Sequence, residues 1–280
     1  MCRWLAYSGG AIPLAALIFN TRHSLIDQSL SSHFSTQTTN GDGFGVGWYD
    51  GLQTPGLYKH TQPAWNDANF HDLCTHIRSP LFMAHVRAST GTAVQHSNSH
   101  PFRYGPLLLV HNGAIRDYQR LRRRLTLALD DAYFREITGS TDSELMFLLA
   151  LQYGMADDVY GGVARMAGFV EKVGLEAGVE HPMQMTLGIS DGRKLHAVRY
   201  SSEGTTRTLF YSRDVKALRE ELGPQQRSLA KQLTDTARCV VSEPLSELKS
   251  LWEPIPEATF VTIEDGHVES RPFAPLRDPG

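Results

Sequence analysis

The arrangement of apolar and polar residues along the chain predicts two groups of strands. Residues 3–7 and 44–49 alternate polar and apolar positions, which is typical of a strand. Residues 80–87 and 106–110 hold few polar side chains, which is typical of strands buried on both faces. Five more strands are predicted in the second half of the chain, at 183–190, 195–200, 206–212, 237–242 and 259–263.

Helices are predicted mainly in the middle of the sequence. Amphipathic or apolar periodicity predicts them at 13–19, 66–77, 117–129, 157–177, 215–222 and 226–234. A further helix opens near residue 141, where Thr141 or Ser140 suits the cap position, with acidic residues such as Asp142 in its first turn. Residues 20–40 are polar and poorly periodic, and we expect a loop there. Strands, then helices, then strands again indicate sheets packed together and flanked by helices, because βαβ units would alternate.

The composition is that of a globular protein of ordinary charge. The 280 residues are 41% hydrophobic, enough for a sizeable core, and we expect one domain over residues 1–280. The formal net charge of -3 indicates neither a nucleic acid nor a membrane surface as partner. We find no secretory signal and no apolar run long enough to span a bilayer, and three widely spaced cysteines do not suit a disulfide framework. A cytoplasmic protein is therefore predicted.

Cys2 directly follows the initiator methionine, and this position gives it unusual chemistry. A small second residue allows an aminopeptidase to remove Met1, which would leave Cys2 with a free α-amine. Because an α-amine titrates near pH 8, its neutral form can take the thiol proton and later give it to a leaving amine. An inert cysteine is the alternative, and residues further along the chain bear on that choice.

Three further positions supply what a cysteine nucleophile needs to cleave an amide. The run His111-Asn112-Gly113, predicted to follow a strand, can aim a side-chain amide and a glycine N–H at a developing oxyanion. Arg87 at a strand end can hold a carboxylate, and Asp142 at a helix start can accept hydrogen bonds from an ammonium group. A ligand with both groups beside a reactive amide is glutamine or a γ-glutamyl amide. Taken singly, each residue also suits a structural role.

Together these residues resemble the glutaminase domain of class II glutamine amidotransferases, a branch of the N-terminal nucleophile hydrolases. The motifs are Met1-Cys2, Gly41-Asp42-Gly43-Phe44-Gly45, His85-Val86-Arg87-Ala88-Ser89-Thr90, His100-Pro101, His111-Asn112-Gly113 and Thr141-Asp142-Ser143-Glu144. The resemblance implies an α+β fold, a four-layer αββα sandwich of two antiparallel sheets flanked by helices. It also implies a set of site residues: Cys2 as nucleophile, Asn112 and Gly113 as oxyanion hole, Arg87 and Thr90 at the α-carboxylate, and Asp142 at the α-amine.

The motifs cover roughly residues 1–150, and the chain departs from the synthase-linked members of that family. Those members usually carry an arginine-glycine pair before the aspartate of the glycine loop, where this chain has Asn40-Gly41, and no synthase domain follows here. The runs Cys2-Arg3-Trp4 and Ser242-Glu243-Pro244-Leu245 look more like the stand-alone members. That group includes the γ-glutamyl amidase of ergothioneine biosynthesis and an amidase component of glutathione breakdown.

The sequence therefore predicts an amidohydrolase that cleaves glutamine or a γ-glutamyl compound through a thioester on Cys2, with no cofactor or metal. Two alternatives stay open: a dedicated amidase for a γ-glutamyl thiol metabolite or peptide, and a non-catalytic regulatory subunit that retains the fold. Beyond the small-molecule substrate, the predicted partners are a separate ammonia-accepting synthase or a second copy of the chain in a homodimer.

Other patterns have simpler explanations. Residues 71–76 contain two histidines and a cysteine at a spacing that resembles metal ligands, but the two histidines do not share a face of the predicted helix. Arg120 with Arg122-Arg123-Arg124 is predicted to form a solvated helix face, with a docking surface for an anionic partner as the alternative. Cys74 and Cys239 are predicted to be buried as small hydrophobic residues.

Overall fold

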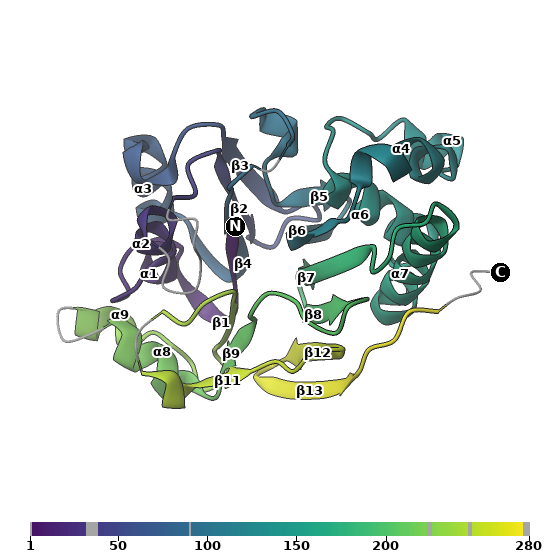
Figure 1. The fold of residues 1–280 in the computed structure, drawn as a ribbon. Coiled ribbons are helices and arrows are strands. Elements are labelled where there is room, and N and C mark those ends of the chain that lie inside the picture. The colour runs from purple at the N-terminus through teal and green to yellow at the C-terminus, as the bar shows by residue number, and fades with distance from the viewer. Residues whose placement is uncertain (1, 32–38, 90, 223–225, 246–247, 277–280) are drawn as a thin grey trace.

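The computed structural model describes residues 2–31, 39–89, 91–222, 226–245 and 248–276, and the strands in these ranges form two antiparallel sheets (Figure 1). The first sheet has the order β11-β9-β10-β1-β4-β2-β3. Its strands are β1 (Arg3–Pro13), β2 (Phe44–Tyr49), β3 (Gly56–His60), β4 (Arg78–Val86), β9 (Phe210–Ser212), β10 (Arg238–Val241) and β11 (Trp252–Pro254). The strand that begins next to Cys2 is thus an inner strand, with β10 on one side and β4 on the other.

The second sheet has the order β13-β12-β8-β7-β6-β5. Its strands are β5 (Phe102–Tyr104), β6 (Leu107–Ile115), β7 (Met183–Ser190), β8 (Leu195–Ser201), β12 (Thr259–Glu264) and β13 (His267–Pro272). Strand β6 pairs with β7 from Leu108 to Ile115, in the register that sets Asn112 opposite Thr186. The register therefore fixes which residues of the His111-Asn112-Gly113 run face the first sheet.

Helices cover the outer face of each sheet, so that the molecule has four layers (Figure 1). The first sheet packs against α1 (Ala15–Ile18), α2 (Leu25–Leu30), α3 (Ala68–His76), α8 (Val215–Leu222) and α9 (Arg227–Ala230). The second sheet packs against α4 (Tyr118–Leu127), α5 (Asp131–Phe134), α6 (Asp142–Gln152) and α7 (Val159–Glu176). Short 3-10 turns occupy Ala64–Asn66, His96–Asn98 and Lys249–Leu251. The αββα sandwich that the sequence predicts is confirmed.

Alternation along the strands separates the core between the sheets from the cores under the helices. On β1, Leu5 and Tyr7 pack toward the helices, whereas Trp4 and Ala6 pack between the two sheets. Side chains two residues apart lie on the same face of a strand. Cys2, two residues before Trp4, therefore belongs to the side of the strand that faces the second sheet.

Three expectations from the sequence are wrong in detail. Residues 20–40 include the helix α2, which begins with a capping box formed by Ser24 and Asp27; residues 32–38 lie outside the described part. His111, Asn112 and Gly113 lie within β6, because β7 continues to pair beyond residue 110. The strand expected at 206–212 is confined to residues 210–212, since the backbone N–H of residue 206 bonds a carboxylate instead of a neighbouring strand.

Several simpler expectations can also be compared with the structure. Cys74 and Cys239 are fully buried as free cysteines, which confirms that prediction. Among the residues that the structure describes, no group of three or more His, Cys, Asp or Glu side chains is placed to hold a metal ion. Within the same residues, none of the helices combines the length and the apolar character that crossing a membrane requires.

Candidate active site

Cys2 directly precedes the inner strand β1, and two hydrogen bonds fix its position. Its Sγ donates a hydrogen bond of 3.5 Å to the carbonyl of Ala88, which follows strand β4. Its own carbonyl accepts a hydrogen bond of 3.0 Å from the guanidinium of Arg3. A residue so close to a chain end normally frays. Here the pairing of β1 with β4 and β10 and these two contacts fix it in place.

A buried ion pair secures the same end of β1. Arg3 Nε lies 2.9 Å from a carboxylate oxygen of Glu243, and His23 Nε2 lies 3.2 Å from the other oxygen. Beside it, Ser242 and Trp4 exchange two hydrogen bonds, Trp4 N to Ser242 Oγ at 3.1 Å and Ser242 N to the Trp4 carbonyl at 3.0 Å. The Ser242-Glu243 run that the sequence singled out thus orients the strand that carries Cys2.

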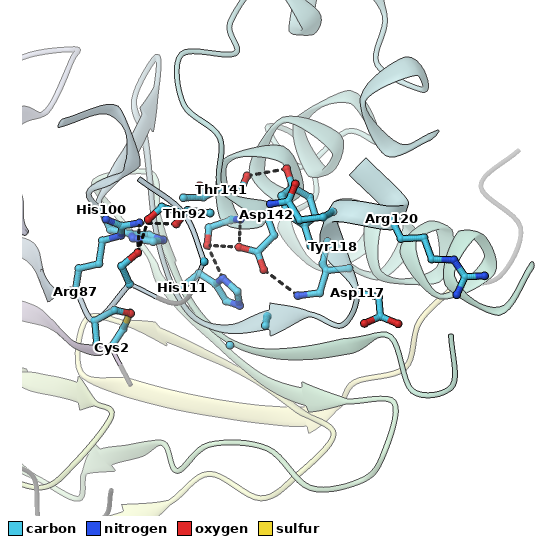
Figure 2. A pocket seen from close by; sticks show the side chains of 18 residues that line it. Cys2, Arg87, Thr92, His100, His111, Asp117, Tyr118, Arg120, Thr141 and Asp142 are labelled. Carbon is cyan, nitrogen blue, oxygen red and sulfur yellow. Dashed lines mark hydrogen bonds between the residues drawn. The ribbon is translucent and has the colours of Figure 1, made fainter. Parts of the chain in front are cut away.

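A cavity of about 540 Å³ opens beside Cys2 (Figure 2). Its wall comes from the segment after β4, the end of β6 and the first turns of α4 and α6. Arg87 and Asp142 supply charged groups of opposite sign, and both act on the pKa of the Cys2 thiol, so both lie near it. The remaining lining residues are Ala88, Ser89, Gly91, Thr92, His100, His111, Gly113, Ala114, Ile115, Asp117, Tyr118, Gln119, Arg120, Thr141 and Ser143.

The guanidinium of Arg87 is buried and fully engaged at its two terminal nitrogens. One nitrogen donates to the carbonyls of Asp42 and Ala93, both at 3.3 Å. The other donates to Ser89 Oγ at 3.2 Å and Thr92 Oγ1 at 2.6 Å. A carboxylate ligand that binds Arg87 would have to replace some of these acceptors. Because hydroxyl groups can also donate, Ser89 and Thr92 could then turn their protons toward the same carboxylate.

Asp142 is held rigidly where α6 begins. Its Oδ2 accepts a hydrogen bond of 2.9 Å from Ile115 N, and its Oδ1 accepts from Ser143 N at 2.8 Å and Ser143 Oγ at 3.3 Å. Thr141 caps the helix by accepting from Glu144 N, as the sequence predicts. Both carboxylate oxygens are therefore oriented before any ligand arrives, and their remaining lone pairs can accept hydrogen bonds from an ammonium group.

Asn112 and Gly113 lie on β6, opposite the strand of Cys2. Asn112 is buried and occupies the face of β6 that, by alternation with Leu108 and Val110, points between the sheets. Its carbonyl accepts a hydrogen bond of 3.1 Å from Thr186 Oγ1, which in turn accepts one of 3.2 Å from the indole N–H of Trp4. Thr186 thus joins β1, the strand that follows Cys2, to β6, the strand of the predicted oxyanion hole.

Gly113 cannot be replaced by a larger residue in this backbone. A Cβ at that position would lie 2.0 Å from the carbonyl oxygen of Gln184 and 2.7 Å from His111 Nε2, and its φ angle is +155°. Such contacts are far shorter than van der Waals separation. The glycine therefore lets β6 and β7 approach closely at the cavity wall.

Three buried histidines lie beside and behind the cavity, and burial lowers the pKa of each. The pKa of His85 falls to about 3, that of His100 falls well below its ordinary value, and that of His111 is also lowered. The rings of His85 and His100 stack with centroids 4.1 Å apart. His85 Nε2 donates to the carbonyl of His111 at 3.2 Å, and His111 Nδ1 lies 2.8 Å from Ser143 Oγ. All three imidazoles are neutral at physiological pH.

Burial also raises the pKa of the Cys2 thiol above its ordinary value. The hydrogen bond with Ala88 and the charge of Arg87 lower it, whereas Asp142 raises it further. The free thiol is therefore protonated at neutral pH, and since the thiolate is the nucleophilic form, a base has to remove the proton.

The structure gathers most of the predicted site residues around one cavity. Cys2, Arg87, Gly113 and Asp142 line it, whereas Asn112 is buried just behind the wall and is not among the described lining residues. Thr90 lies outside the residues that the structure describes. Sequence reasoning did not assign roles to Ser89, Thr92, Tyr118, Ser143 and Thr186, although Ser89 and Ser143 stand inside the quoted motifs. Arg120 of the basic run reaches the cavity rim and points away from Cys2 (Figure 2).

Comparisons with known proteins agree with this geometry. The family model of class II glutamine amidotransferases matches residues 14–276. The chain is 32% identical to the probable glutamine amidotransferase DUG3 of Saccharomyces cerevisiae, over 94% of this chain and 82% of that protein. It is 33% identical to the gamma-glutamyl-hercynylcysteine sulfoxide hydrolase of Mycobacterium tuberculosis, over 41% of this chain and 50% of that protein.

A solved structure extends the likeness over nearly the whole fold. The glutamine aminotransferase class-II domain protein from Silicibacter pomeroyi superposes with a TM-score of 0.72 and 29% identity, covering 98% of this chain and all of that one. Cys2 precedes the range of the family match, and the αββα architecture around it is shared. The chain is therefore an enzyme that belongs to the class II glutamine amidotransferases.

Proposed function

We propose that this enzyme hydrolyses the γ-amide of glutamine or of a related γ-glutamyl compound through a γ-glutamyl thioester on Cys2, after Met1 has been removed. One observation carries the proposal: Cys2 borders a cavity whose wall holds a cation, Arg87, and an anion, Asp142. A γ-glutamyl group ends in a carboxylate and an ammonium on one carbon, and these two side chains are the matching pair. The same cavity bears Gly113 next to Asn112, as an oxyanion hole requires.

The reaction proceeds in two balanced halves. The Cys2 thiolate attacks the γ-carbonyl carbon, the C–N bond breaks as the C–S bond forms, and the leaving nitrogen takes up a proton. Water then attacks the thioester carbon, releasing glutamate and restoring the thiol. In each half the negative charge that develops on the carbonyl oxygen is stabilised by Asn112 and the Gly113 region, worth on the order of 3 kcal/mol for each donor.

The histidines are weak candidates for the base, which supports the terminal amine instead. Burial raises the pKa of the Cys2 thiol and lowers the pKa of His85 to about 3. A base so much weaker than the thiolate would remove the proton rarely. An α-amine that titrates near pH 8 is a far better match, and only removal of Met1 places it on Cys2.

Covalent labelling tests the nucleophile. A diazoketone analogue of glutamine should add one label to the N-terminal peptide of the processed enzyme, and a Cys2→Ala variant should take up none. Cys74 and Cys239 are the internal controls, because both thiols are fully buried. Labelling at either of them, with Cys2 unmodified, would refute the assignment.

An N-terminal extension tests the base. Processed protein and a form with an uncleavable residue before Cys2 are assayed side by side on glutamine and γ-glutamylglycine. We expect the extended form to keep its circular dichroism spectrum and lose turnover, while the processed form gains activity through a group that titrates near pH 7 to 8. Full activity in the extended form would exclude the α-amine as base and leave the Cys2 assignment standing.

A dedicated amidase for a larger γ-glutamyl compound is the second candidate. The cavity volume of about 540 Å³ lies in the range that accommodates drug-sized ligands, which exceed glutamine. The similarity to a hydrolase of gamma-glutamyl-hercynylcysteine sulfoxide points the same way. A panel of γ-glutamyl amides, compared by kcat/KM, ranks the two candidates.

A further inference from the structure

Arg207 is a cation near the nucleophile that the proposed chemistry does not use. It lies in the segment between β8 and β9 and is partly buried. Its Nε is buried without a hydrogen-bond partner, and within the described part of the chain its guanidinium makes no hydrogen bond or ion pair. Taking a guanidinium out of water without a counter-charge is unfavourable, so such a group is poised to bind an anion.

Hydrogen bonds fix the chain on both sides of Arg207, and on one side they link it to the strand that follows Cys2. Thr208 Oγ1 donates a hydrogen bond of 2.9 Å to the carbonyl of Ser242, and Ser242 exchanges two hydrogen bonds with Trp4. On the other side, Thr206 N donates to Glu257 at 3.1 Å. These hydrogen bonds hold the segment that carries Arg207 in place near the start of β1.

Two acidic residues bonded to or beside the neighbours of Arg207 form ion pairs with other arginines. Glu243 pairs with Arg3 at 2.9 Å, and Glu257 lies 3.5 Å from Arg199 Nε. Burial lowers the pKa of Arg207, the positive charge of Arg3 lowers it further, and the negative charge of a Cys2 thiolate raises it. Arg207 thus lies within electrostatic reach of Cys2 and of the cation Arg3.

Arg87 and Arg207 approach Cys2 from opposite edges of β1. Arg87 follows β4, which pairs with one edge of β1. Arg207 precedes Thr208, which bonds Ser242 directly after β10, the strand that pairs with the other edge. An amide bound at Cys2 likewise has two sides, the glutamyl group and the leaving amine. We propose that Arg207 binds the free carboxylate of an amino acid whose amine is the leaving group, so that the preferred donors are γ-glutamyl amino acids. This inference rests on the proposed function.

Covalent geometry places the carboxylate of a leaving amino acid where a guanidinium beside Cys2 can bind it. In a γ-glutamyl amino acid, two bonds separate the leaving nitrogen from the carboxylate carbon, a distance of roughly 2.5 Å. The carboxylate is therefore always near the attacked carbon, and a guanidinium beside Cys2 can meet it with two parallel hydrogen bonds. Glutamine releases ammonia, which carries no such group, and leaves Arg207 without a counter-charge.

The test uses two donors that differ only in this charge. γ-Glutamylglycine and γ-glutamylglycinamide are compared by kcat/KM on the processed wild type, Arg207→Gln, Arg207→Lys and a control, Arg213→Gln. Arg213 carries the same charge a few residues along, but it is exposed and pairs with Glu253 at 2.8 Å. We expect the wild type and the control to prefer the carboxylate donor by about tenfold or more. In Arg207→Gln that ratio should fall toward one, and Arg207→Lys should retain part of it.

Unfolding measurements separate this role from a structural one. Removal of a cation without a counter-charge should leave the Tm of Arg207→Gln equal to or above that of the wild type, whereas a structural arginine would lower it. Equal kcat/KM for both donors in the wild type, or an unchanged ratio in Arg207→Gln, would overturn the inference and leave the proposed function intact. A processed wild type that hydrolyses neither of these donors nor glutamine would overturn both.

Discussion

Replacing Thr186 with valine tests whether one hydroxyl couples the two sheets at the site. Thr186 is fully buried between them, where it accepts from the Trp4 indole and donates to the carbonyl of Asn112. Valine has nearly the same shape and the same branching at Cβ, so packing and strand preference are retained. The substitution therefore removes little apart from the two hydrogen bonds.

The expected loss of stability in Thr186→Val follows from the two polar groups that lose their hydrogen-bond partner, the Trp4 N–H and the Asn112 carbonyl. The Trp4 side chain is buried, so its N–H would have no water to replace the Thr186 hydroxyl, and an unsatisfied buried donor costs about 1–3 kcal/mol. The Asn112 carbonyl loses one donor as well. We expect the free energy of unfolding of Thr186→Val to fall by about 2 kcal/mol. Turnover of γ-glutamyl donors should fall by roughly tenfold, because Asn112 would no longer be tied to the strand of Cys2.

Urea denaturation followed by circular dichroism gives the stability change, and steady-state kinetics on γ-glutamylglycine gives the change in turnover. Thr186→Ser is the matched control, because it keeps the hydroxyl and removes a methyl group. A double-mutant cycle with Trp4→Phe isolates the hydrogen bond between the two side chains. The reasoning is refuted if Thr186→Val unfolds within about 0.5 kcal/mol of the wild type, or if serine and valine are equally damaging.

Three further predictions follow from single contacts. Glu243→Gln should lower the free energy of unfolding by about 3–5 kcal/mol, since Arg3 loses its buried carboxylate partner; a urea titration that shows less than about 1 kcal/mol would contradict this. Gly113→Ala should prevent correct folding or abolish turnover, because its Cβ would lie 2.0 Å from the Gln184 carbonyl; a soluble, fully active variant is the contrary result. In chains that keep Met1, alkylation of Cys2 by iodoacetamide should still accelerate above pH 9, because burial raises the pKa of the thiol; a plateau below about pH 8 would oppose this.

Much of the fold can be read from the pattern of the sequence. The apolar runs at 80–87 and 183–190 predict strands that the structure confirms, and the cap at Thr141 marks the start of α6. These signals are local: they arise from alternation over a few residues and from the hydrogen bonds of a single turn. Helix α2 was not predicted. Its capping box of Ser24 and Asp27 is present in the sequence, but the helix is too short for its apolar residues to show a helical period.

The sequence by itself determined the types of chemical group available and the order in which they occur. A cysteine beside the initiator methionine, an arginine and an aspartate at element ends, and an asparagine-glycine pair are readable without a structure, and their order identified the family. The strand period also places Cys2 on the same side of β1 as Trp4, because alternation follows from local backbone geometry.

Only the tertiary structure decided which of these groups meet and which remain without partners. The order β10-β1-β4 brings Ala88 and Ser242 to the two edges of the strand that begins beside Cys2, although they are far apart along the chain. The Trp4–Thr186–Asn112 link depends on contacts between residues separated by 74 positions or more. Such contacts form when two sheets bury their apolar faces together, and neither periodicity nor capping specifies them, because both report only on residues within a few positions of each other.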